Sequence, residues 1–240
     1  MSKISRTLAA AAVAGTLMPI GLASAASAQS SVVMCYGYAA TIVGTPSNDT
    51  LWGTSGRDVI AGLGGNDELH GTGGDDIICG GDGNDELWGG SDDDKVAGNA
   101  GDDVIHGGAG ADQLAGFEGV DTIYGEAGDD RLDSGDGFDF GRDWGDGRLV
   151  GGAGQDLLRG SAGQDSAAGE AGDDNLYGFA GNDRLNDWED HNRLFGGNGD
   201  DVLDARDPDP GFRYDDRLWG DLGRDRCVFD RGDEARSCEL

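Results

Sequence analysis

Aspartate recurs along this chain at a fixed interval of nine residues. The first run has no gap and comprises Asp49, Asp58, Asp67, Asp76, Asp85, Asp94, Asp103, Asp112, Asp121, Asp130 and Asp139. A second run comprises Asp156, Asp165, Asp174, Asp183 and Asp201. Carboxylates are ligands of hard divalent cations, and calcium in particular takes six to eight oxygens in a flexible geometry. The spacing therefore predicts a series of cation sites.

Two other residue types keep the same period. A glycine stands five residues before each of the first ten aspartates, from Gly44 to Gly125, and an aliphatic residue stands two residues after each, from Leu51 to Leu132. Such a nonapeptide is too short for a helix. It predicts a three-residue strand whose aliphatic residue points inward, followed by a turn that uses the glycine and the aspartate.

The residue after each aliphatic shows a second period, of 18 residues. Large side chains alternate there with small ones and recur as Trp52, His70, Trp88, His106 and Tyr124. We infer that one coil contains two nonapeptides, with the bulky side chains stacked on one face and the small ones on the other. The predicted fold is all-β: a parallel β-roll, or two-sheet β-solenoid.

Aspartates 18 residues apart, such as Asp76 and Asp94, then lie one coil apart, at about 5 Å. Two unneutralised charges at that distance repel by about 3 kcal/mol at an effective dielectric near 20. One buried aliphatic residue per nonapeptide contributes only about 1.5–3 kcal/mol. We therefore expect folding to be coupled to the binding of up to about twelve cations, one for each aspartate pair 18 residues apart.

The nonapeptides resemble the RTX, or hemolysin-type calcium-binding, repeat family, whose motif is G-G-x-G-x-D-x-U-x. The close matches are residues 71–78, 80–87 and 107–114, and the resemblance extends over most of residues 44–225. It implies that Ca²⁺ binds between successive coils through the aspartate carboxylates and the turn carbonyls. The chain departs from the family's large exported proteins in having an N-terminal leader and no attached catalytic domain, which weighs against a toxin role.

Composition excludes several other functions. The 240 residues include 47 Gly, and 47 acidic side chains against 17 Lys and Arg give a net charge of −30. This charge disfavours nucleic acid and anionic membrane surfaces as partners. The chain contains no G-x-S-x-G, H-E-x-x-H or EF-hand motif, and His70, His106 and His191 have no nucleophile at a recognisable spacing. We predict that the protein is not an enzyme.

The N-terminus predicts a secretory signal peptide. Lys3 and Arg6 precede an apolar stretch over residues 8–22, and the small residues 26–28 form a cleavage signature. No other apolar run is long enough to span a bilayer. A secreted location favours disulfides, and four cysteines allow three connectivities. We predict Cys35–Cys79 at the N-terminal cap and Cys227–Cys238 at the C-terminal end, with pairing between molecules as the alternative.

The predicted organisation has six parts. They are a signal peptide (1–28), an N-terminal cap (29–43), a main repeat block (44–141), a register break (142–150), a second repeat block (151–203), and a loop with a disulfide-closed C-terminal cap (204–240). The outer aromatic column allows a second function, because exposed rings could bind a glycan or the cell wall. The alternative is that these rings only stack along the sheet. The sequence favours a secreted, calcium-loaded protein with a structural or cell-surface role.

Overall fold

The computed structural model describes residues 33–135, 148–188, 190–206, 215–230 and 232–239. These residues belong to one compact unit that begins at Val32. They form strands and turns, with no α-helix among them, and therefore no helix in this part of the chain that could cross a membrane.

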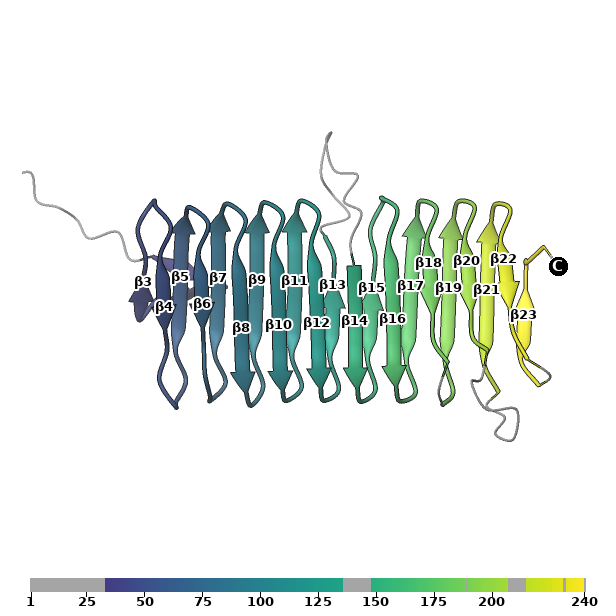
Figure 1. Cartoon of the computed structure of the whole chain (residues 1–240), viewed down its shortest axis with the longest axis horizontal. Helices are drawn as coiled ribbons and strands as arrows, with labels where there is room; N and C mark the ends of the chain where they lie inside the picture. Colours follow the sequence, from purple (N-terminus) through teal and green to yellow (C-terminus); the bar gives the residue numbers. More distant parts are fainter. Residues whose placement is uncertain (1–32, 136–147, 189, 207–214, 231, 240) are drawn as a thin grey trace, which may run out of the picture. The chain divides into compact units, whose positions relative to one another are not determined.

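Most strands belong to two parallel sheets, which lie one behind the other in Figure 1. The ten-stranded sheet contains β4 (Thr50–Trp52), β6 (Glu68–His70), β8 (Glu86–Ser91), β10 (Val104–Ala109), β12 (Thr122–Ala127), β14 (Arg148–Ala153), β16 (Ser166–Ala171), β18 (Arg184–Asn186), β20 (Val202–Asp204) and β22 (Arg226–Val228). The eleven-stranded sheet contains β3 (Ile42–Val43), β5 (Val59–Gly64), β7 (Ile77–Asp82), β9 (Lys95–Ala100), β11 (Gln113–Glu118), β13 (Arg131–Asp133), β15 (Leu157–Arg159), β17 (Asn175–Ala180), β19 (Arg193–Asn198), β21 (Arg217–Leu222) and β23 (Glu234–Arg236). Successive strands of the chain alternate between the two sheets, so one coil holds two nonapeptides. The predicted parallel β-roll is confirmed.

The aliphatic column forms the core between the sheets. Within the main block, each aliphatic residue pairs with the one 18 residues later, as Leu69 does with Leu87 and Ile78 with Val96. From Ile60 to Leu218 these side chains are almost fully buried and form a single cluster. One inward residue per strand is enough because the neighbours of each aliphatic residue point outward.

A hairpin of β1 (Met34–Cys35) and β2 (Tyr38–Ala39) packs on the outer face of the eleven-stranded sheet, over β5 and β7. The small residues Ala61 and Cys79 leave room for this hairpin, and Ala61 is only 3% exposed. Cys35 and Cys79 form a disulfide there, and Cys227 and Cys238 form a second at the other end of the roll. Both predicted pairings are confirmed.

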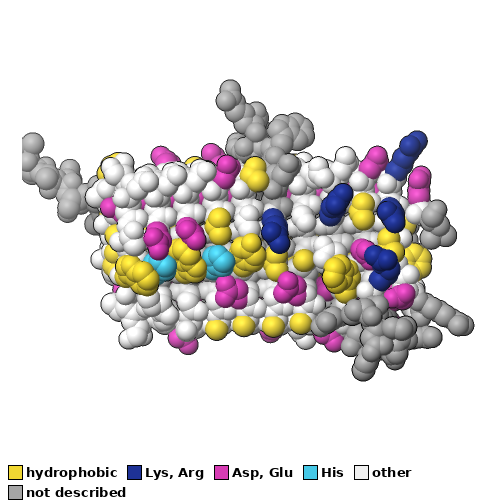
Figure 2. Space-filling view, in the orientation of Figure 1, with side chains coloured by type: hydrophobic (Ala, Val, Ile, Leu, Met, Phe, Trp, Pro, Cys, Tyr) yellow, Lys and Arg dark blue, Asp and Glu magenta, His cyan; other side chains and the backbone are white. Residues whose placement is uncertain are grey.

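The bulky outer column forms a continuous stack on the ten-stranded sheet. The rings of Trp52, His70, Trp88, His106 and Tyr124 lie nearly parallel, with centroids 3.7–5.7 Å apart. Figure 2 shows the two histidines alternating with hydrophobic side chains in one row. The predicted large and small faces are therefore confirmed for this half of the roll.

The stack changes sheet in the second half. After Tyr124, the outer positions on the ten-stranded sheet are the smaller Val150 and Ala168. A second stack begins on the eleven-stranded sheet with Tyr177, Phe195 and Trp219, whose neighbouring rings are 4.6 and 4.4 Å apart. Stacked aromatic rings thus lie on the ten-stranded sheet in the first half of the roll and on the eleven-stranded sheet in the second.

The two register breaks do not end the roll. Strand β12 pairs with β14, which begins at Arg148, and β13 pairs with β15, so both sheets continue across the first break. Similarly, β19 pairs with β21 and β20 with β22 across residues 207–214. Within residues 204–240, predicted as a loop and a C-terminal cap, β21, β22 and β23 add to the same two sheets.

Candidate metal centre

The periodic aspartates form two hydrogen-bonded ladders, one along the turns that precede each sheet. The backbone N–H of Asp76 donates to Oδ1 of Asp94, and the N–H of Asp94 donates to Oδ1 of Asp112, each at 2.8 Å. The same bond recurs at 2.8 Å from Asp67 to Asp85. One oxygen of each ladder carboxylate is therefore fixed by the preceding coil, 18 residues earlier in the sequence.

The other oxygen of most ladder carboxylates is buried and has no hydrogen-bond partner. This is true of Oδ2 in Asp67, Asp76, Asp85, Asp94, Asp103, Asp112, Asp121, Asp130, Asp156, Asp174, Asp183, Asp201 and Asp225. Each of these residues is at most 3% exposed. A buried polar atom without a partner costs roughly 1–3 kcal/mol, and more when the group is charged. A repeated set of such oxygens implies a repeated ligand.

The glycine column leaves space beside these oxygens. A Cβ added to Gly89 would lie 2.5 Å from Oδ2 of Asp94 and 2.6 Å from the carbonyl oxygen of Gly107 in the next coil. The column thus needs glycine because the carboxylate of its own nonapeptide and a backbone carbonyl of the next coil approach the same point. Carboxylate and carbonyl oxygens at one point are the donor set that calcium prefers.

Burial raises the pKa of the ladder carboxyls. Burial and the charges of neighbouring ladder aspartates together raise the pKa of Asp94 and Asp103 to about 8, although the backbone N–H bond acts to lower it. The pKa of Asp156 and Asp183 rises to about 7 for the same reasons. Desolvation and like charges both disfavour the ionised form, so these carboxyls need a proton or a cation to remain buried.

Three predicted ligands have their second oxygen occupied by a donor of their own turn. Oδ2 of Asp49 and of Asp58 accepts both the N–H and the hydroxyl of a threonine four residues earlier. Oδ2 of Asp165 accepts the N–H of Ser161 at 2.6 Å. These three turns carry Thr or Ser where the motif has its second glycine. Asp139 lies outside the described residues.

The ladders continue across both breaks and include Asp216 and Asp225, which are not among the predicted ligands. The backbone N–H of Asp130 donates to Oδ1 of Asp156 across the first break. Across the second break, the N–H of Asn192 donates to Oδ1 of Asp216, and the N–H of Asp201 to Oδ1 of Asp225. The signal was present as the weak restart of the nine-residue period at Asp216 and Asp225, which are 2% and 0% exposed.

The residues that stand immediately before the ladder aspartates form a second polar ladder. It is more exposed than the first, and it was not predicted. The N–H of Asn66 donates to Oδ1 of Asn48, and the N–H of Asn84 to Oδ1 of Asn66. On the other edge, the N–H of Asp93 donates to Oδ1 of Asp75. The direction is opposite to that of the aspartate ladder, so each turn is tied to the coil before it and to the coil after it.

The donor set fits calcium with a large backbone contribution. Among the described residues, no three His, Cys, Asp or Glu side chains come together in a group that could hold a metal ion. The ladder positions instead bring a buried carboxylate oxygen next to a backbone carbonyl, repeatedly and at equivalent places. A parallel β-roll with these turns defines a calcium-binding repeat protein.

The comparison with known families agrees. The family model of the RTX calcium-binding nonapeptide repeat matches residues 37–69, 52–87, 80–114, 106–140, 143–176, 159–186, 177–207 and 213–233. The chain belongs to this family. A search of curated proteins found no match.

Proposed function

We propose that this chain is a secreted protein that folds when several Ca²⁺ ions bind between its stacked turns, and that it has a structural or cell-surface role without catalysis. The observation that carries this proposal is the series of buried Oδ2 atoms that have no partner in the protein. A cation at each position would supply the missing partner and neutralise the ladder.

The aspartates proposed as ligands fall into two groups. The ladder members with an unpartnered oxygen are the main candidates, and Asp216 joins them as a ladder member beyond the second break. Asp49, Asp58 and Asp165 already bind local donors through Oδ2 and would contribute less. The proposed total remains at up to about twelve ions, because calcium requires several oxygens at each site.

Secretion is supported by two features. The N-terminal sequence has the basic start, apolar stretch and small-residue site of a signal peptide. The two disulfides also fit an oxidising compartment. N-terminal sequencing of protein recovered from the medium tests this part: we expect the chain to begin near Gln29, and retention of Met1 would contradict it.

Calcium titration tests the central claim. In excess chelator, circular dichroism should show little β-structure, and added calcium should restore it with several ions bound per chain at saturation. Magnesium at the same concentration is the control, because its preference for a small octahedral site fits flexible turns poorly. A complete β spectrum in chelator, or saturation without bound calcium, would overturn the proposal.

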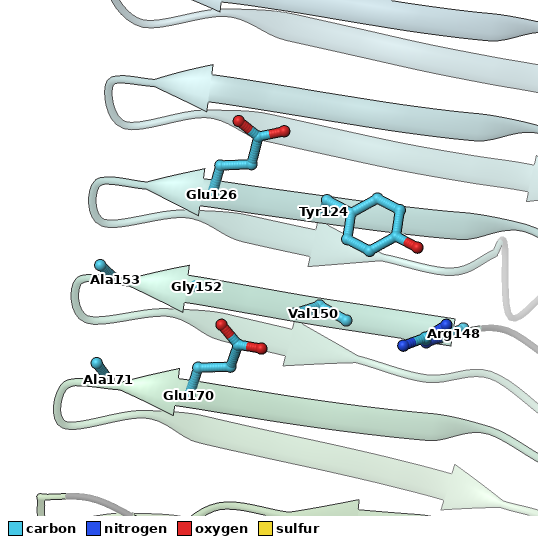
Figure 3. A pocket seen from close by; sticks show the side chains of 8 residues that line it. All are labelled: Tyr124, Glu126, Arg148, Val150, Gly152, Ala153, Glu170 and Ala171. Carbon is cyan, nitrogen blue, oxygen red and sulfur yellow. The ribbon is translucent and has the colours of Figure 1, made fainter.

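The outer aromatic stack gives little support to the alternative of a glycan partner. A ring face in the interior of the stack is covered by the next ring, as His70 is between Trp52 and Trp88. Sugars bind aromatic residues through ring faces, so mainly edges remain. Tyr124 is the last ring of the first stack, and a pocket lies beside it. In this pocket, Glu126 and Glu170 lie on either side of Gly152 (Figure 3). Retention of the calcium-loaded protein on a glycan or cell-wall matrix would support a glycan partner.

A further inference from the structure

Asp187 departs from the repeat in a way that the calcium ladders do not explain. It occupies the column in which other nonapeptides have glycine, such as Gly169 and Gly178, and it follows β18 directly. Its side chain is 1% exposed, and neither of its two carboxylate oxygens has a hydrogen-bond partner. A fully buried carboxylate whose two oxygens have no partner destabilises the folded protein unless it binds a ligand.

The Asp187 carboxylate faces a ladder carboxylate. Oδ2 of Asp187 and Oδ2 of Asp174 both lie within 3.0 Å of the point where Gly169 would carry a Cβ. At equivalent positions elsewhere, such as Gly89, that point is bordered by one carboxylate oxygen and one backbone carbonyl. Here, one oxygen from each of two carboxylates borders it. Burial and the charge of Asp174 both raise the pKa of Asp187.

The neighbouring ladder position explains why the fold tolerates this additional charge. Asn192 stands where the ladder otherwise has aspartate, and its Oδ1 accepts the N–H of Asp174 at 2.9 Å. Asn192 therefore preserves the hydrogen bond of the ladder but not its charge. Asp187 restores one carboxylate to the same region, and its carboxylate, unlike those of the ladder, points at the space beside Asp174 with both oxygens available.

We propose that Asp174 and Asp187 form a two-carboxylate cation site, in which Asp187 adds a second carboxylate to a ladder position, and that this site binds the first Ca²⁺ ion taken up by the roll. Two facing carboxylates balance the charge of one divalent ion, whereas an ordinary ladder position offers one unpartnered carboxylate oxygen. Affinity for calcium rises with the number of charged ligands at a site. The proposal rests on the proposed function, since it assumes that the roll binds calcium.

The test is equilibrium dialysis of calcium against the full chain and the variants Asp187→Asn and Asp187→Gly. Asp187→Gly restores the residue that other coils carry, so it keeps the fold testable if Asp187→Asn destabilises it. We expect both variants to bind one ion fewer and to lose the calcium site of highest affinity. The dissociation constant of the first bound ion should rise at least about tenfold. The matched control is Glu170→Gln, which removes an exposed charge beside Gly169 on the outer face.

The outcomes separate the possible failures. If both Asp187 variants bind the first ion as tightly as the unmodified chain, the facing carboxyls share a proton and the site is not a cation site. If Glu170→Gln weakens the first ion equally, bulk charge explains the effect and the proposal fails. If the unmodified chain binds no calcium, the proposed function itself is wrong.

Discussion

Each ladder aspartate performs two tasks with its two oxygens. Oδ1 accepts a backbone N–H of the preceding coil and so joins neighbouring coils. In most of them, Oδ2 has no hydrogen-bond partner in the protein and remains available to a cation. Substitutions that separate the two tasks can therefore distinguish the role of the carboxylate as a connector from its role as a ligand.

Asp94→Asn retains an Oδ1 acceptor for Asp76 and removes the charge. We expect it to lower bound calcium by about one or two ions and to raise the calcium midpoint, because two neighbouring coils lose a charged ligand. In chelator it should favour the folded form, because a buried charge is gone. Calcium stoichiometry and circular dichroism measure both effects. Glu86→Gln removes the same charge at an exposed position and should change neither the calcium stoichiometry nor the calcium midpoint. Equal shifts in the two variants would mean that the ladder aspartates act only through the net charge of the protein.

Gly89→Ala tests the space beside the carboxylate. The added Cβ would meet Oδ2 of Asp94 and the backbone oxygen of Gly107, and the backbone cannot move away cheaply. We expect a loss of about 1–3 kcal/mol in the free energy of unfolding at saturating calcium. The control is Gly73→Ala, whose Cβ would find its nearest neighbour 4.0 Å away, at Ser91. The midpoint of thermal unfolding should be clearly lower for Gly89→Ala than for Gly73→Ala. Equal midpoints would contradict the close approach of the two oxygens to Gly89.

The strands carry backbone strain at one repeated position. The residue three after the aliphatic has a positive φ, and in several coils it is not glycine: Leu63 has φ 85°, whereas the equivalent Gly90 has φ 119°. A left-handed conformation costs an L-residue other than glycine about 1–2 kcal/mol. These coils fold despite the strain because both neighbours in the sheet impose the same path.

Leu63→Gly should therefore stabilise the calcium-loaded roll by about 1 kcal/mol, since the relief of strain exceeds the entropic cost of glycine. Leu63→Ala is the matched control: it removes the same half-exposed side chain but keeps the strain. Chemical denaturation at saturating calcium provides the comparison. If Ala stabilises the roll as much as Gly, the side chain and not the backbone is the source of the effect.

The two disulfides act on opposite ends of the stack. Cys35–Cys79 holds the β1–β2 hairpin on β5 and β7, and we expect Cys35→Ser to increase hydrogen exchange in β3, β5 and β7 but not in β19 or β21. Coils contact mainly their neighbours, so damage should stay local. Cys238→Ser should show the reverse distribution. Exchange that rises throughout the roll in either variant would contradict local coupling.

At the scale of the molecule, the pKa values predict that acid can replace calcium in part. The pKa of Asp94 and Asp103 in the folded chain is about 8, against an ordinary value of 3.8. The folded form thus binds more protons, so its calcium-free stability is fully present below about pH 4 and is lost as the pH rises through 8. In chelator, β-structure measured by circular dichroism should increase from pH 8 to pH 5.

The calcium affinity should fall over the same interval, because protons compete with the ion for the carboxylates. Calorimetric titrations at several pH values measure this competition and should show proton release on calcium binding. A calcium-free protein that gains β-structure with increasing pH would contradict the assignment of the buried carboxyls.

The nine-residue period predicted the coil, the core and most of the ladder, because each of these depends on residues at fixed intervals. The breaks could not be predicted in the same way. An 18-residue coil would place Arg148 beside Asp130, whereas the structure pairs Asp130 with Asp156, 26 residues later. The partner of Asp130 is therefore a choice of pairing over long sequence separation that the period alone does not determine. Asp187 interrupts the glycine column of the sequence, but only the structure shows that its carboxylate lies beside that of Asp174.

The stacking of coils also has a mechanical consequence. The hydrogen bonds between strands run along the stacking direction, so tension between the two ends of the roll would separate one coil at a time. Each released coil of 18 residues adds about 60 Å of extended chain. If each coil holds an ion as proposed, releasing a coil also releases its ion, and the calcium concentration would set the force at which the roll lengthens. The Cys35–Cys79 and Cys227–Cys238 bonds would withhold the residues that they enclose from this extension, so that the coils between them would extend first.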